Sequence, residues 1–129
     1  MKRLRLIPLL FVPMLAISIS WADIASDVYV FPNPWRPQGP KAGVGPGQTG
    51  SGSDGLIFTN LPSECRIRIF SMSGELVRDI QHSDVSSGTP AQERWDARNR
   101  DGHPAASGVY LWRVESAGGA KNGKLMIIR

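Results

Sequence analysis

Hydrophobic and polar positions alternate along several short segments of this 129-residue chain. Over Cys65–Phe70, the cysteine and two isoleucines fall on one face, while two arginines fall on the other. This period of two predicts a half-buried strand. Ser73-Gly74 then predicts a turn, and Glu75–Ile80 a second strand that completes a hairpin.

Similar short apolar segments recur along the chain, separated by turn-forming Gly, Pro, Asn and Asp residues. They predict strands at Asp27–Phe31, Leu56–Phe58, Gln92–Trp95, Val109–Glu115 and Lys124–Ile128. After residue 22, no stretch of ten or more residues shows the apolar stripe of an amphipathic helix. About seven strands of this kind predict an all-β fold, a single antiparallel β-sandwich over residues 23–129.

The strand at 109–115 supplies the best candidate for a core face. Tyr110, Trp112 and Val114 share one side of it, and aromatic side chains contribute most of the apolar area in a small core. Tyr110 lies near the start of this strand, where a sandwich can place a tyrosine corner. Cys65 shares a face with isoleucines, which predicts a buried structural thiol.

The first 22 residues show the pattern of a cleavable secretory signal. A basic start at residues 2–5 precedes an apolar stretch at 6–19, and Ser20-Trp21-Ala22 supplies the small residues before a cut at Asp23. The apolar stretch, about 14 residues long, is shorter than the ~20 needed for a membrane-spanning helix. We therefore predict export across a bacterial inner membrane, to the periplasm, the outer-membrane surface or the medium.

Subtracting this segment changes the charge balance. The whole chain has 15 Lys and Arg against 11 Asp and Glu. Residues 1–22 hold three of the basic residues and none of the acidic ones, which leaves 12 against 11. The basicity therefore does not indicate a nucleic-acid partner. A lone cysteine, Cys65, excludes an internal disulfide even in an oxidising compartment.

Prolines and glycines dominate the region between the first two predicted strands. Three prolines within residues 32–37 exclude a helix or a central strand. Pro32 and Pro34 predict an extended crossing from one sheet edge toward the other. Gln38–Gly55 is rich in Gly, Pro and Ser, and we predict a flexible loop there.

Several segments, taken in order, resemble one known family. Residues 29–35 (YVFPNPW) open like the carboxy-terminal sorting domains of type IX secretion substrates and like the FlgD-type immunoglobulin-like domain. The later segments resemble the FlgD-type pattern, and together the matches cover almost all of 27–129. They are 57–62 (IFTNLP), 67–78 (IRIFSMSGELVR), 95–102 (WDARNRDG), 107–114 (SGVYLWRV) and 123–129 (GKLMIIR).

The resemblance implies an immunoglobulin-like sandwich with a set of structural positions. Ala97 departs from the pattern, because it stands where the family usually has glycine. Gly74 and Gly102 are expected to adopt positive φ in hairpin turns, and Asn99 and Asp101 to bond the loop backbone. The full set of structural motif residues is Pro32, Asn33, Pro34, Gly74, Trp95, Asp96, Gly102, Gly108 and Tyr110.

The resemblance also implies a function. It predicts an exported, non-enzymatic module for sorting, anchoring or assembly at the bacterial cell envelope, with secretion or envelope-assembly machinery as its partner. It places the recognition signal in the last strand, and strand addition to an exposed edge is the expected mode. The predicted contact residues are Lys124, Leu125, Met126, Ile127, Ile128 and Arg129. Two alternatives stay open: a structural or adhesive subunit that binds protein or carbohydrate, and a fragment of a longer secreted hydrolase.

Two loop segments offer candidate chemistry. Residues 96–102 contain acidic residues ahead of a glycine, but arginines at 98 and 100 occupy the alternate positions where a calcium loop needs oxygen ligands. A plain turn is therefore predicted. Ser107, His103 and Asp101 are neighbours in sequence, whereas a catalytic triad needs its members held together on rigid supports.

The two histidines, His82 and His103, are expected in loops, and their spacing is not that of metal ligands. We therefore predict no enzymatic activity, and no cofactor, metal ion or small-molecule substrate.

Overall fold

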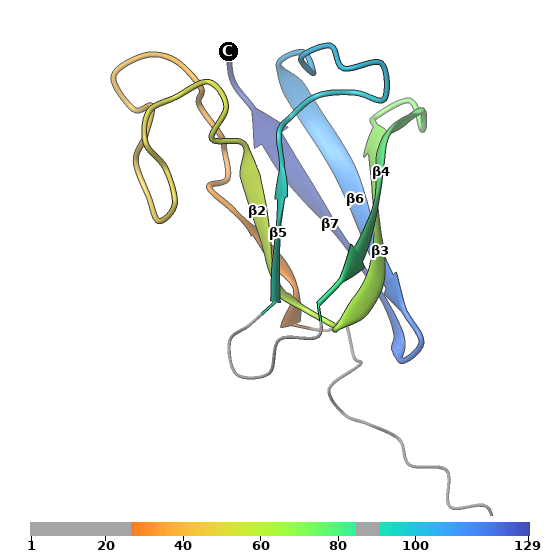
Figure 1. Ribbon diagram of the computed structural model, residues 1–129. Coiled ribbons are helices and arrows are strands. Elements are labelled where there is room, and N and C mark those ends of the chain that lie inside the picture. The colour runs from red at the N-terminus through yellow and green to blue at the C-terminus, as the bar shows by residue number, and fades with distance from the viewer. Residues whose placement is uncertain (1–26, 85–90) are drawn as a thin grey trace, which may run out of the picture.

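Two antiparallel sheets face each other in the computed structural model, which describes residues 27–84 and 91–129 (Figure 1). The smaller sheet has the order β1-β2-β5 and consists of β1 (Tyr29–Phe31), β2 (Leu56–Leu61) and β5 (Ala91–Trp95). The larger has the order β4-β3-β6-β7 and consists of β3 (Glu64–Ser71), β4 (Leu76–Ser83), β6 (Gly108–Ser116) and β7 (Gly119–Ile127). All seven elements of regular structure in these residues are strands. The predicted all-β, immunoglobulin-like sandwich of about seven strands is confirmed.

One expected feature lies in a part of the chain that the structure does not describe. The secretory signal predicted at residues 1–22 is outside the described residues and stays a prediction. Within the described residues, no helix is long and apolar enough to span a membrane.

Three strands extend several residues beyond their predicted bounds at one end. β2 continues to Leu61 through Asn60, whose φ of 56° lies in the left-handed region, with a register shift between Phe58 and Leu61. β4 continues past Ile80 to Ser83. β7 begins at Gly119, well before the predicted start at Lys124, and pairs with β6 along its whole length. Local composition underestimates these strands because their pairing partners lie elsewhere in the sequence.

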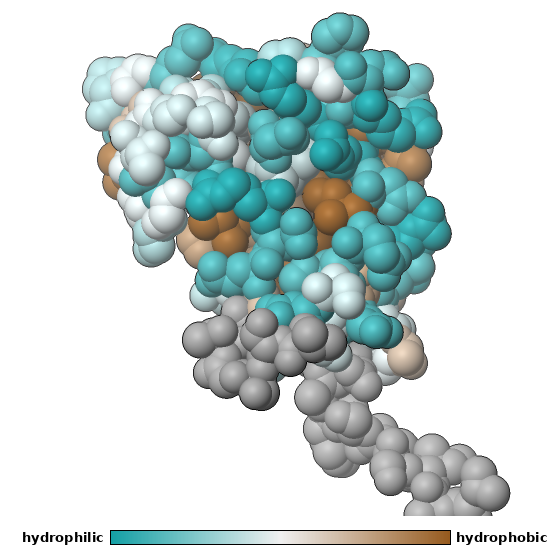
Figure 2. All heavy atoms as spheres, viewed as in Figure 1, coloured by the Kyte–Doolittle hydropathy of each residue, from teal (hydrophilic) through white to brown (hydrophobic). Residues whose placement is uncertain are grey.

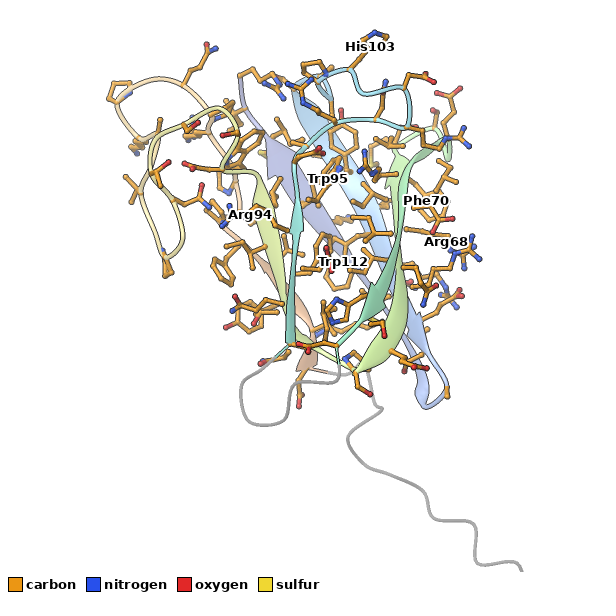
Figure 3. All side chains as sticks on the ribbon, in the orientation of Figure 1. Arg68, Phe70, Arg94, Trp95, His103 and Trp112 are labelled. Carbon is orange, nitrogen blue, oxygen red and sulfur yellow. The ribbon has the colours of Figure 1, made fainter. Side chains whose placement is uncertain are left out.

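The core lies between the two sheets and contains the predicted face of β6. Tyr110, Trp112 and Val114 are all buried. The Trp112 ring meets the Phe58 ring edge-on, with centroids 5.7 Å apart, so β6 packs directly against β2 of the opposite sheet. Trp95 and Trp112 point into the space between the sheets, whereas Arg68 and Phe70 lie on the outer side of β3 (Figure 3). Outside, the face bordered by β4 and β5 is mainly hydrophilic (Figure 2).

The tyrosine corner predicted at the start of β6 is present. The Tyr110 hydroxyl donates a 2.6 Å hydrogen bond to the Ala106 carbonyl, four residues upstream. Burial raises the pKa of Tyr110, so the phenol stays a protonated donor. This bond fixes the loop before β6 to the strand that follows it.

A glycine on β7 makes room for one of the core tryptophans. Gly123 pairs with Trp112, and a Cβ at Gly123 would lie 2.2 Å from Cζ2 of the indole. The Trp112 ring therefore lies directly over the β7 backbone, a close approach that any larger residue at position 123 would block.

The connection between β5 and β6 contains Ala97, which stands where the resembled family usually has glycine. Ala97 has φ of 56°, a left-handed conformation that favours glycine, and its side chain is fully buried in the core. Asn99 Oδ1 accepts hydrogen bonds from the backbone amides of Asp101 and His103, both 3.0 Å, as expected of a loop-bonding asparagine. Gly102 has φ of 82° and Gly74 has φ of 89°, as predicted.

The second half of the Gly-rich loop at 38–55 is bonded to the rest of the fold. The buried Asp54 carboxylate accepts 2.8 Å hydrogen bonds from the amides of Thr49 and Gly50, and a 2.6 Å bond from the Thr49 hydroxyl. These bonds, above all that from the Thr49 hydroxyl, lower the pKa of Asp54. Arg94 on β5 donates to the carbonyls of Asp54 and Gly47. Composition alone indicated none of these contacts, and the loop's predicted flexibility stays a prediction.

Candidate partner-binding surface

The chain crosses from the smaller sheet to the larger one directly after β1. Trp35 forms a parallel bridge with Ile127 on β7. Its amide donates to the Met126 carbonyl at 2.8 Å, and its carbonyl accepts from the Ile128 amide at 3.0 Å. The crossing predicted from Pro32 and Pro34 is therefore confirmed, and it ends on the outer edge of β7.

Asn33 extends this contact by two side-chain hydrogen bonds. Its Nδ2 donates to the Lys124 carbonyl at 3.1 Å, and its Oδ1 accepts from the Met126 amide at 3.0 Å. Asn33 and Trp35 thus occupy the backbone groups that this part of β7 would offer to an added strand. Strand addition at Lys124–Ile128, the mode expected from the sequence, is therefore wrong for this edge: the chain's own crossing segment already fills it.

The six predicted contact residues separate into three pairs. Leu125 and Ile127 are core residues, each 1% exposed. Ile128 holds the crossing through Trp35, and Arg129 lies over the Trp35 ring, with its guanidinium carbon 5.4 Å from the centroid. That leaves Lys124 and Met126, which project from the outer face of the sheet. Together with Arg129, which is also exposed, these two residues are the accessible part of the predicted site.

Two adjoining hollows, each of about 550 Å³, lie beside Lys124 and Met126 and share Asn33 as a common wall. The first is lined mainly by Met72, Val109, Lys124 and Met126, and the second by Pro32, Pro34, Arg36, Lys41 and Val44. We call these residues, with Asn33, the β7 surface. Sequence analysis missed five of them, because Met72, Val109, Arg36, Lys41 and Val44 reach this place only through the hairpin, the sheet and the crossing.

Exposed apolar side chains are concentrated on the β7 surface. Among the described residues, Tyr29, Val44, Met72 and Met126 are the large apolar side chains that stand exposed. Val44 is 67% exposed, Met72 62% and Met126 39%, and these three line the two hollows. Clustering of exposed apolar side chains marks candidate interaction sites, whereas scattered ones do not.

The charges of the β7 surface differ from those on the rest of the sheet's outer face. Away from the hollows, Arg66 pairs with Asp79, while Arg68 and Arg113 share Glu115. The hydrogen bond from Arg66 lowers the pKa of Asp79, and that from Arg113 lowers the pKa of Glu115, so both carboxylates stay charged in neutral solution.

The cations of the β7 surface have no such partners. In residues 27–84 and 91–129, no ion pair involves Lys124, Arg36 or Lys41, and no carboxylate lines either hollow. The outer face therefore combines a band of paired charges with a surface that is apolar and cationic.

On the side bordered by β4 and β5, a side-chain hydrogen bond joins the two sheets. His82 is 4% exposed on β4, and its Nδ1 lies 2.7 Å from Glu93 Oε2 on β5. The prediction of His82 in a loop is wrong: the alternation that includes Ile80 continues to His82. Cys65, its neighbour on β3, is buried as predicted, and burial raises the pKa of this thiol to about 11. No group of three His, Cys, Asp or Glu residues in the described part of the chain could hold a metal ion.

The loop residues that were candidates for catalysis lie in segments held by local hydrogen bonds. Ser107 Oγ accepts a 2.8 Å hydrogen bond from the Arg129 amide, and the His103 amide donates to Asn99. The segment 96–102 forms a turn in which the Gly102 amide donates to the Asn99 carbonyl at 3.0 Å. The predicted turn is confirmed, and these residues support the end of β7 and the start of β6.

Two solved structures of bacterial proteins are similar to this fold. PorZ of Porphyromonas gingivalis, an essential bacterial surface component of the type IX secretion system, superposes with a TM-score of 0.60 and 27% identity over 87% of this chain. Dimeric latent PorU from the same organism superposes with a TM-score of 0.51 and 24% identity over 78% of this chain, a likeness of fold alone. The chain spans 13% of the PorZ chain and 9% of the PorU chain. No protein-family model and no curated protein matches the sequence.

Proposed function

We propose that this chain is an exported, non-enzymatic β-sandwich module that acts in sorting, anchoring or assembly at the bacterial cell envelope through the type IX secretion machinery. The observation that carries the proposal is the similarity to PorZ, a surface component of that system, over 87% of this chain. The sequence resemblance to type IX sorting domains and the FlgD-type domain agrees with it, although a shared fold alone does not dictate function.

The β7 surface supplies the contact that such a module needs. It joins Lys124 and Met126, from the segment where the resemblance implies a recognition signal, with Met72 and Val44. Because the backbone edge beside them is occupied by Asn33, the partner would be recognised by side chains on the outer face. This mode replaces strand addition in the proposal.

The non-enzymatic part of the proposal rests on what the candidate residues do. The Ser107 hydroxyl is engaged by the Arg129 amide, and Asn99 binds the backbone of the loop that carries His103. The buried thiol of Cys65, with its pKa raised to about 11, is a poor nucleophile near neutral pH. Each of these groups has a structural role.

The test uses the full chain, with a reporter protein inserted between residues 26 and 27 so that the last strand keeps its own end. The fusion is expressed in a bacterium with a type IX system and in an otherwise identical strain that lacks it. We expect the reporter at the cell surface or in the medium only in the first strain. The same distribution in both strains would rule the proposed function out.

A further inference from the structure

We propose that the β7 surface binds a protein segment in which acidic side chains flank apolar ones, an inference that rests on the function proposed above. The apolar part of the site consists of Val44, Met72 and Met126. Methionine side chains are flexible and polarisable, so such a surface accepts apolar side chains of different shapes. Hollows of about 550 Å³ each have room for several such side chains.

The charge of the segment follows from the three cations that border these hollows. Lys124, Arg36 and Lys41 gather around the apolar area, and no carboxylate among the described lining residues offsets them. Elsewhere on the same face each arginine of β3 and β6 has an acidic partner within the chain. A partner that brings its own carboxylates complements this potential, which favours fast and selective association.

The geometry of the β7 edge determines how the segment binds. Asn33 lies between the two hollows and holds the backbone of Lys124 and Met126. A bound segment therefore passes over Asn33 and places side chains in both hollows, without adding a strand to β7. The Met126 amide keeps its bond to Asn33 in the complex.

The test measures binding of fluorescent synthetic peptides to the full chain by anisotropy. The probe peptide carries Glu and Asp on either side of Leu and Phe, and a matched peptide carries Lys in place of the acids. We expect the acidic peptide to bind and the basic peptide not to bind. Lys124→Glu and Lys41→Glu, both at exposed positions, should each weaken binding by about three- to tenfold, as should a rise in salt. Arg100→Glu, an equal charge reversal on an exposed loop residue, should have no effect.

Three results would overturn the inference. These are equal binding of both peptides, unchanged binding by Lys124→Glu, and binding of the chain to vesicles of anionic phospholipid but not to the acidic peptide. The reporter assay separates this inference from the function on which it rests. If surface delivery depends on the type IX system but is unaffected by Lys124→Glu and Lys41→Glu, the acidic partner is wrong and the proposed function stands. If delivery is independent of that system, the proposed function fails, and the peptide result still decides the chemistry of the surface.

Discussion

Replacing Gly123 with alanine tests whether the Trp112 ring lies directly on the β7 backbone beside the candidate site. The added Cβ would lie 2.2 Å from Cζ2 and 2.4 Å from Cε2 of the indole, where 3.4–4 Å is an ordinary contact. The ring must therefore move by about an ångström. Trp112 is 5% exposed and packed against Phe58, so this movement disturbs the core.

The size of the effect follows from two opposing terms. Overpacking of a core costs about 1–3 kcal/mol, and a contact this short belongs at the upper end of that range. Loss of glycine's extra freedom in the unfolded chain offsets about 0.4–1 kcal/mol. We therefore expect Gly123→Ala to lower the free energy of unfolding by about 2 kcal/mol, measured by urea denaturation followed by circular dichroism.

Two further variants make the test specific. Gly52→Ala places a methyl group where no atom lies within 4 Å, so it should change stability by less than about 0.5 kcal/mol. In a Trp112→Phe background the smaller ring leaves room for the methyl group, and Gly123→Ala should cost much less than in the native chain. If Gly123→Ala proves as stable as Gly52→Ala, or costs the same with and without the indole, the packing described here is refuted.

Three other predictions concern the β7 edge and the opposite side of the sandwich. Asn33→Ala removes both side-chain bonds to β7, so we expect a loss of about 1–2 kcal/mol in urea denaturation; unchanged stability would contradict it. Glu93→Ala leaves the buried Nδ1 of His82 without its partner and should cost about 1–3 kcal/mol, and a double variant with leucine at both positions should recover most of this loss. The raised pKa of Cys65 means that the folded state holds the thiol proton more tightly than the unfolded state does. The contribution of this thiol to the free energy of unfolding is therefore complete below pH 9 and is lost as pH rises toward 11, about 2–3 kcal/mol in all. A Cys65→Ala variant should lack this part of the pH dependence, and equal stability–pH profiles for the two proteins would disprove it.

The sequence predicts those parts of the fold whose signal is local. Alternation defines β3 and the inner face of β6, and Tyr110 forms its corner with a carbonyl only four residues upstream. Prediction from the sequence fails where a residue's place in the fold depends on a partner that is distant in the sequence. Gly123 looks like a strand breaker but belongs inside β7, because Trp112 lies over it from the neighbouring strand. His82 looks like a loop residue because its neighbours in sequence are polar, yet its side chain is buried against Glu93 of the opposite sheet.

The candidate site could be predicted only in part for the same reason. Lys124 and Met126 lie in the segment that the resemblance indicated, but alternation sends Leu125 and Ile127 into the core. Asn33, far from them in sequence, closes the edge through two side-chain hydrogen bonds that no local pattern reveals. Arg36 comes from the proline-rich crossing and Lys41 from the loop whose composition suggested flexibility alone, and both reach the site because the crossing segment brings them there.

We propose that the type IX secretion machinery recognises this module through the β7 surface. The most direct measurement is the fraction of the full-length reporter fusion delivered to the cell surface or the medium in a type IX-proficient host. Met72→Ser and Met126→Ser remove exposed apolar contacts from the surface, and Tyr29→Ser, which removes an apolar side chain that is 52% exposed and outside both hollows, is the control. We expect reduced delivery for the two methionine variants and native delivery for the tyrosine variant. Native delivery of Met72→Ser and Met126→Ser, with both proteins folded, would contradict it.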